Sequence, residues 1–347
     1  MENTVKFFLG ANSDSGFMSY FKQLQEQSSL QLLILKGGPG SGKSSLMKRV
    51  GEYAMQSGHS VEIVPCASDP ESYDAIIDKT ANFAMIDGTA PHTEDPLVPG
   101  AKHHIMYMGD LWSKEKLKEK TDEIEFYSNL TAQLHSGGQS YIKAAGALLR
   151  ENYRCSSRYV LPEAKQFALE IMKELPEGNK YTEEKRLLSA VTVEKIGFLE
   201  ESLPLLADDV YVIEDEWGSA SEAVFDTVRL AASLKNMHVI SCPCSVMPDK
   251  TDHIILPGAR VAFTKGNRFL KSSYGQKINA DAFYEKGIDR ISCEKRSQDA
   301  KKLLIRACSF VKSAKKAHDN LEKFYITAMD FGRMNELYEK ILKDFYR

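Results

Sequence analysis

Residues 32–50, LLILKGGPGSGKSSLMKRV, decide the fold of this chain. An apolar run typical of a buried parallel strand leads into a glycine-rich turn, and a helix with apolar positions at Leu46, Met47 and Val50 follows. The turn matches the pattern G-x-x-x-x-G-K-[ST] at every fixed position, from Gly37 to Ser44. The stretch therefore predicts a strand, a phosphate-binding loop and a helix, in that order.

The residue types in this loop suit a nucleotide and its metal ion. Glycines let the backbone turn so tightly that successive N–H groups face a phosphate, and the helix N-terminus behind them carries partial positive charge. We expect Lys43 to reach the β and γ phosphates of ATP and the Ser44 hydroxyl to bind Mg²⁺. The residues predicted to contact the nucleotide are Gly37, Gly38, Pro39, Gly40, Ser41, Gly42, Lys43, Ser44 and Ser45.

A second ligand for the metal is expected at the end of another apolar strand. Residues 83–87, FAMID, end in Asp87, which we predict to bind Mg²⁺ and to act with Lys43 in catalysis. Another apolar strand lies within GHSVEIVPCASDP (58–70), so the predicted order is strand, loop, helix, strand, helix and strand. Because Gly88 follows Asp87, a simple turn residue is the alternative interpretation.

The chain carries an internal repeat, which appears when the sequence is aligned with itself so that Leu32 corresponds to Val210. The identities in this ungapped alignment include Gly40 with Gly218, Ser41 with Ser219, Pro65-Cys66 with Pro243-Cys244, Pro70 with Pro248 and Ala84 with Ala262. The chemical positions differ: Lys43 corresponds to Ser221, Ser44 to Glu222, Gly42 to Ala220, Gly37 to Asp215 and Asp87 to Lys265. The stretch VYVIEDEWGSASEA (210–223) is therefore interpreted as a degenerate copy of the loop, and the alternative is that Glu214 or Asp215 serves the first site as an acid.

The repeat suggests two α/β units with three layers and parallel sheets, each followed by a helical extension. We predict a first unit at 1–178, with its core at about 1–112 and its extension at about 113–178. The degenerate unit is predicted at 179–347, with its core at about 179–285 and its extension at about 286–347.

Arginines in the first extension could handle a transferred phosphate. Arg150, Arg154 and Arg158 are spaced by four and would share one helix face if the helix continues that far. An exposed basic face is the alternative. The corresponding places in the second extension hold Asp319, Lys323 and Thr327, which agrees with loss of phosphate handling there.

Other polar residues give weaker signals. His92, His103 and His104 follow Asp87 and could orient water, as could Asp69 at the end of the neighbouring strand. Loop histidines are more often structural, and we predict no general base. Cys242 and Cys244 lack the remaining ligands of a zinc site and are predicted to pack in the core.

Composition indicates which binding partners and which cellular compartment to expect. With 45 basic and 48 acidic side chains the chain has a net charge of -3, so binding to nucleic acid or to an anionic membrane is not indicated. The six cysteines form no CxxC pair, the start has no signal-peptide pattern, and no run of eighteen apolar residues occurs. We expect a cytoplasmic protein.

The segments FFLGANSDSGF, LLILKGGPGSGKSSLMKRVG, CASDPES and FAMIDGTAPH together resemble an uncharacterised family of Firmicute-type bacterial ATPases built from two tandem P-loop halves. The resemblance covers most of the chain and implies nucleotide binding through Gly37 to Ser45 on a P-loop NTPase fold, with no assigned substrate. Members tend to carry a P-loop in each half, so the second half departs from the family here.

The leading expectation is a Mg²⁺-dependent ATP hydrolase. The alternatives are a small-molecule or nucleotide kinase with an unknown acceptor, and a nucleotide-gated binding protein whose second half docks a protein partner. Guanine specificity is less expected because no N/T-K-x-D element is present.

Overall fold

The structure is a computed structural model that describes residues 4–91 and 93–346. These residues form two compact units. The first unit comprises the N-terminal segment up to Gly10, Ser19–Gly138 and Ser309–Arg347, and the second comprises Ala11–Met18 and Gln139–Cys308. This division differs from the contiguous halves 1–178 and 179–347 that the sequence suggests, because two long helices each continue from one unit into the other. These helices are α4 (Thr121–Ser156) and α8 (Arg290–Ala328).

A mixed sheet forms the centre of the first unit, in the order β4-β5-β6-β3-β7. Its strands are β3 (Gln31–Lys36), β4 (Val61–Pro65), β5 (Tyr73–Asp78), β6 (Phe83–Asp87) and β7 (His103–Tyr107). Strand β3 lies between β6 and β7 and runs parallel to both. The predicted α/β class is confirmed, but the prediction of parallel sheets is wrong in part, because β5 runs antiparallel to β4 and β6.

The predicted helix between β4 and β6 is also wrong, because strand β5 occupies this place. Its six residues, YDAIID, are too few for an ordinary helix, and Ala75, Ile76 and Ile77 are all buried. The chain then turns at Asn82, whose φ of 51° is in the left-handed region that asparagine tolerates. The Asp78 carboxylate accepts hydrogen bonds from the Thr80 and Ala81 amides, which stabilises this tight turn.

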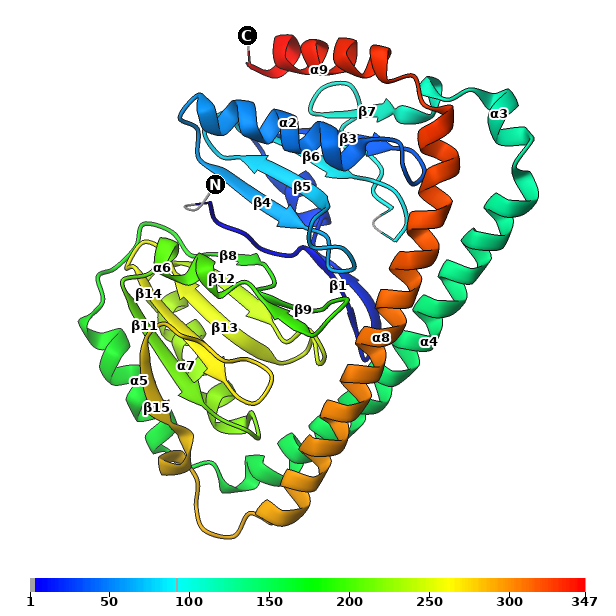
Figure 1. The fold of residues 1–347 in the computed structure, drawn as a ribbon. Helices are drawn as coiled ribbons and strands as arrows, with labels where there is room; N and C mark the ends of the chain where they lie inside the picture. The colour runs from blue at the N-terminus through cyan, green and yellow to red at the C-terminus, as the bar shows by residue number, and fades with distance from the viewer. Residues whose placement is uncertain (1–3, 92, 347) are drawn as a thin grey trace. The chain divides into compact units, whose positions relative to one another are not determined.

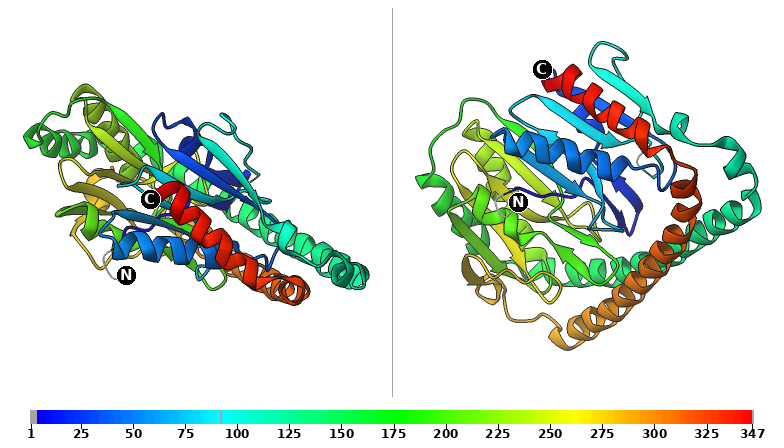
Figure 2. Two further views of the ribbon diagram at one scale, coloured as in Figure 1. Left: turned by 90° about the horizontal axis from the view of Figure 1, so that it is seen from above. Right: turned by 45° about the horizontal axis from the view of Figure 1, so that its top comes forward.

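Helices cover the first sheet unevenly. Helix α2 (Lys43–Gln56) and helix α9 (Phe331–Tyr346) lie side by side over one face (Figures 1 and 2). The apolar side chains between them and the sheet include Leu46, Met85 and Ile341. The other face packs against Leu9, Phe21 and Leu24, the last of these in the short helix α1 (Lys22–Glu26). This core fixes β3 and α2, and therefore the loop that joins them.

The remaining elements of the first unit follow β7 along the chain. They are the 3-10 turn η1 (Met108–Leu111), helix α3 (Lys114–Lys118), and the ends of α4 and α8 that belong to this unit. The Ala328 carbonyl at the end of α8 accepts a hydrogen bond from the Ser113 amide, and the Leu111 carbonyl accepts one from the Asp330 amide. Helix α8 is thereby attached to the segment that follows β7.

The second unit is built on a sheet of the same plan, in the order β15-β11-β14-β13-β12-β8. Its strands are β8 (Thr182–Lys185), β11 (Asp209–Glu214), β12 (His238–Pro243), β13 (Thr251–Leu256), β14 (Val261–Gly266) and β15 (Gln276–Asn279). Strand β13 is antiparallel to its neighbours, as β5 is in the first unit. Its helices are α5 (Glu163–Glu174), α6 (Leu203–Leu206) and α7 (Ser219–Leu234), with 3-10 turns η2 (Ser157–Tyr159), η3 (Glu200–Ser202) and η4 (Ala280–Phe283).

Backbone conformation repeats in the same alignment that reveals the repeat in the sequence. Strand β3 begins at Gln31 and β11 begins at Asp209, which is the counterpart of Gln31. Three pairs of residues with positive φ also correspond in this alignment: Gly40 with Gly218, Gly58 with Asn236, and Asn82 with Arg260. A two-stranded hairpin precedes β3 and another precedes β11 along the chain, β1 (Gly10–Ser13) with β2 (Gly16–Ser19) and β9 (Ser189–Val191) with β10 (Ile196–Phe198).

Candidate functional site

The candidate site is the loop between β3 and α2 in the first unit. Its backbone depends on glycine, since φ is 65° at Gly40 and 79° at Gly42. A Cβ atom on Gly37 would lie 2.9 Å from Met108 Cβ, which is too close for two carbon atoms. Pro39 is partly buried and Ser45 is exposed at the start of α2. The loop is therefore held tightly against η1 on one side.

Lys43, the first residue of α2, lies along the inside of the loop. Its Nζ donates hydrogen bonds to the carbonyl oxygens of Gly37 and Gly38, at 2.9 Å each. The same nitrogen lies 3.6 Å from Asp87 Oδ2, and the Lys43 side chain is only 9% exposed. The buried ammonium group of Lys43, with one carboxylate beside it, can attract an anion that binds to the loop.

The structure brings Asp87 next to the loop, as the sequence predicts. Because β3 and β6 are parallel and adjacent, Asp87 pairs in register with Leu35, two residues before Gly37. Its Oδ1 accepts hydrogen bonds from the Thr89 amide (2.9 Å) and the Thr89 hydroxyl (2.5 Å). Asp87 thus stabilises a turn, as in the alternative interpretation, while its Oδ2 faces Lys43.

The Ser44 hydroxyl and the Asp87 carboxylate fit a magnesium ion by their chemistry. Both are oxygen ligands, and the Ser44 hydroxyl oxygen accepts one hydrogen bond, from the Tyr73 amide at 2.9 Å. Within the described residues no cluster of three or more His, Cys, Asp or Glu side chains is placed to hold a metal. Mg²⁺ at nucleotide sites typically takes one or two protein ligands and completes its octahedron with phosphate and water.

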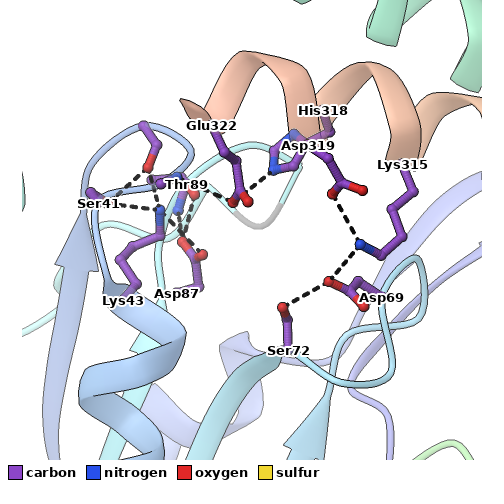
Figure 3. A network of polar contacts seen from close by, with 12 residues as sticks. Ser41, Lys43, Asp69, Ser72, Asp87, Thr89, Lys315, His318, Asp319 and Glu322 are labelled. Atoms are coloured by element: carbon purple, nitrogen blue, oxygen red, sulfur yellow. Dashed lines mark hydrogen bonds and ion pairs between the residues drawn. The ribbon is translucent and has the colours of Figure 1, made fainter. Parts of the chain in front are cut away.

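Helix α8 adds polar side chains that no motif in the sequence indicates. Lys315, His318, Asp319 and Glu322 point from one face of α8 toward the loop and the end of β4 (Figure 3). The Gly40 amide donates a hydrogen bond to Glu322 Oε1 at 3.2 Å, and His318 Nε2 lies 3.5 Å from the same oxygen. The His318 contact lowers the pKa of Glu322, so that side chain is a carboxylate at neutral pH. Lys315 Nζ lies 2.9 Å from Asp319 and 3.4 Å from Asp69.

The placement of Asp319 corrects one inference from the repeat. The repeat places Asp319, Lys323 and Thr327 in the second copy, where loss of phosphate handling is expected. These residues belong to the first unit, because α8 enters that unit at Ser309. The only signal in the sequence is the spacing of the four polar residues, which is that of one helix face.

The corresponding loop of the second unit holds a carboxylate of its own. Helix α7 begins at Ser219, two residues before Ser221, the counterpart of Lys43, so the turn before it is shorter. Asp215 accepts hydrogen bonds from the Trp217 and Ser221 amides and from the Tyr284 hydroxyl, at 2.8 to 3.0 Å. Asp215 is 2% exposed, and Glu214 pairs with Lys277 in the same unit. Both acids thus have partners within the second unit.

Glu222 occupies the place of Ser44 and keeps one of its contacts. The Thr251 amide donates a hydrogen bond to Glu222 Oε2 at 2.9 Å, and Thr251 is the counterpart in the repeat of Tyr73, the partner of Ser44. Burial raises the pKa of Glu222 from 4.5 to about 7, although the Thr251 hydrogen bond opposes this rise. A side chain that is largely protonated at pH 6 is unsuited to hold a divalent cation.

The raised pKa of Glu222 predicts that the contribution of this side chain to stability falls as the pH rises from about 4.5 to about 7. In this window the folded state binds a proton at Glu222 that the unfolded state has lost, so the free energy of unfolding falls by at most ~3 kcal/mol. Replacing Glu222 by Gln should remove this part of the pH dependence, measured by urea unfolding followed through Trp217 fluorescence in a Trp112→Phe background. Glu170→Gln, at an exposed position on α5, is the control. An unchanged pH profile in Glu222→Gln would contradict the prediction.

Lys265 occupies the place of Asp87 and forms a buried ion pair. Its Nζ lies 2.6 Å from Asp252 Oδ1, with the two side chains 7% and 3% exposed. Burial disfavours charge on both groups, but their mutual attraction outweighs it, lowering the pKa of Asp252 and raising that of Lys265. The acid position of the first unit has therefore become a basic one.

The remaining candidates from the sequence have structural partners. Arg150 donates to Asp14 and lies 2.6 Å from Asp249, all three in the second unit, and Arg154 pairs with Glu151. Arg158 lies in η2 because α4 ends at Ser156, so the arginine stripe does not continue along one helix.

The histidines and cysteines are likewise part of the structure. His103 is buried, accepts hydrogen bonds from the Leu97 and Val98 amides, and has a pKa lowered by burial. His104 contacts the Phe345 ring, and His92 lies outside the described residues. Cys242 and Cys244 are buried, as predicted, and burial raises the pKa of the Cys244 thiol to about 12.

Comparison with family models, with curated proteins and with solved structures finds no match to this chain. The resemblance to tandem bacterial ATPases therefore stays a prediction. In the described part of the chain no helix has both the length and the apolar character needed to cross a bilayer.

Proposed function

We propose that this protein binds ATP with Mg²⁺ at the loop Gly37–Ser44 and hydrolyses it, and that its second unit is a non-catalytic copy of the first. The observation that carries the proposal is the placement of Lys43. Its ammonium group lies inside a glycine-dependent loop, at a helix N-terminus and 3.6 Å from the carboxylate of Asp87. Loop amides, a lysine and an acid beside a parallel strand are among the parts that phosphoryl transfer from ATP requires.

Each residue has a separate task in this mechanism. Amides of the loop bind phosphate oxygens, and Lys43 exchanges its bonds to the Gly37 and Gly38 carbonyls for a phosphate oxygen. Ser44 and Asp87 would hold Mg²⁺, which supplies further positive charge against the triphosphate. Thr89 orients Asp87 through the hydrogen bonds to its Oδ1.

The contacts of the second unit support a scaffold role. Asp215 already accepts hydrogen bonds from the Trp217 and Ser221 amides, and Ser221 and Lys265 replace the lysine and the acid. An incoming phosphate would meet a buried carboxylate there.

A binding protein gated by nucleotide, with little turnover, is the second candidate. The contact of Glu322 with the Gly40 amide favours it. The loop would have two states, one with Glu322 on this amide and one with a phosphate, and nucleotide binding would convert the first into the second. A kinase is less well supported, since Arg150 is already bound by two carboxylates.

The test is Mg²⁺-dependent release of phosphate from ATP by the full chain. We expect release by the wild type and its loss, by at least about 100-fold, in Lys43→Ala. Lys22→Ala, at an exposed position on α1, is the matched control and should retain full activity. Turnover that requires an added acceptor would favour the kinase, and ATP binding through Lys43 without turnover would favour the gated binding protein.

A further inference from the structure

The C-terminal helices of this chain cover the phosphate-binding loop closely. A Cβ atom on Gly40 would lie 2.7 Å from the backbone oxygen of Glu322, and one on Gly42 would lie 2.6 Å from Met334 Cε. Tyr325 of α8 also lies close to a glycine of the loop, Gly38. Its ring packs against the Trp112 ring, with 5.0 Å between ring centroids. Three glycines of the loop thus contact α8 or α9, in segments that belong to the same unit.

Within this contact, Glu322 makes the interaction that a phosphate needs. Its carboxylate accepts a hydrogen bond from the Gly40 amide, and both carboxylate and phosphate oxygens bind such amides as anions. A single amide hydrogen cannot serve both groups at full strength, and two anions placed side by side repel each other. A nucleotide bound through the Gly40 amide therefore requires the Glu322 side chain to move away.

In the second unit, a buried carboxylate accepts hydrogen bonds from amides of the corresponding loop. There the carboxylate of Asp215 accepts amide hydrogens at the start of α7, is 2% exposed, and is also held by Tyr284. Glu322 differs because its side chain is 36% exposed and reaches the loop from a neighbouring helix. It can therefore rotate into solvent without moving α8, whose end stays attached through the Ser113 and Asp330 amides.

We infer that Glu322 is an internal competitor of the nucleotide, an anion from α8 that occupies the loop and is displaced when the triphosphate of ATP binds. This inference rests on the proposed function, because it concerns the same loop. It makes Glu322 a residue that weakens ATP binding, in contrast to a catalytic residue, which would leave affinity nearly unchanged and accelerate turnover.

The test compares the affinity of full-length variants for the β,γ-imido analogue of ATP with Mg²⁺, by titration calorimetry. Glu322→Gln keeps an oxygen that can accept from the Gly40 amide but removes the charge, and Glu322→Ala removes the whole group. We expect Kd to fall about tenfold in Glu322→Gln, which corresponds to ~1.4 kcal/mol, and at least as much in Glu322→Ala. Glu336→Gln, an exposed carboxylate on α9, is the matched control and should leave Kd unchanged.

The outcomes separate this inference from the proposed function. Tighter binding that disappears when Lys43→Ala is added supports the inference. An unchanged or weaker affinity in both Glu322 variants, with Lys43→Ala still weakening the wild type, overturns the inference and leaves the nucleotide site in place. Loss of phosphate release at unchanged Kd would likewise overturn it in favour of a catalytic Glu322. Binding that is indifferent to Lys43 in every variant would overturn both.

Discussion

Replacing Lys265 by methionine is expected to lower the free energy of unfolding of the second unit by about 3–5 kcal/mol. The Lys265 ammonium lies 2.6 Å from Asp252, and both side chains are almost fully buried. Methionine fills a similar volume but leaves the Asp252 carboxylate buried without its counter-charge. A buried ion pair adds little compared with apolar residues, but the removal of one partner is strongly destabilising.

Urea unfolding followed by fluorescence measures this effect in the unit concerned. The chain has two tryptophans, Trp112 in the first unit and Trp217 in the second, so a Trp112→Phe background makes Trp217 the reporter. Lys277→Met removes a lysine that is 62% exposed and paired with Glu214, and it should change stability by less than about 1 kcal/mol. The double variant Lys265→Met, Asp252→Leu should regain much of the loss. An effect of Lys265→Met no larger than that of Lys277→Met would contradict the prediction.

Replacing Asp87 by asparagine is expected to lower Mg²⁺-dependent ATP hydrolysis by about 100- to 1,000-fold. Asparagine keeps the Oδ1 oxygen that accepts hydrogen bonds from Thr89, so the turn after β6 is preserved. It removes the negative charge that faces Lys43 and would help to hold Mg²⁺. Folding and catalysis are thereby tested separately at one position.

Phosphate release measured across a range of Mg²⁺ concentrations checks this result. Asp95→Asn removes an acid that is 87% exposed and paired with Lys36, and its activity should stay within about twofold of the wild type. Full activity in Asp87→Asn would mean that Asp87 serves only as a turn residue.

The strand, loop and helix at the candidate site could be predicted because their signals are local. A run of buried apolar residues, glycines at the positions with positive φ, and Lys43 at the start of α2 all lie within the single stretch 32–50. Strand β5 is not predicted because periodicity alone does not distinguish a buried strand from a helix in a short apolar run, although its length of six residues favours the strand. The turn at Asn82, which makes β5 and β6 a hairpin, was the signal that could have distinguished them.

The contacts of α8 with the loop cannot be predicted from local sequence patterns. Glu322 is 282 residues away from Gly40, and no periodicity indicates where a 39-residue helix will enter another unit. The repeat even suggested the opposite, since it assigned Asp319 and its neighbours to the second copy. In the second unit the repeat was informative, because it identified Asp215, Glu222 and Lys265 as replacements. The structure adds that each of these has a partner within its own unit.

The most direct test of the central claim is the affinity of the wild-type chain for MgATP, measured beside that of Lys43→Ala and Lys22→Ala. We predict saturable binding of one ATP per chain by the wild type and by Lys22→Ala, and a Kd at least about 100-fold weaker in Lys43→Ala. Equal binding by all three proteins, or no binding by the wild type and by the Glu322 variants, would show that the loop at Gly37–Ser44 is not a nucleotide site.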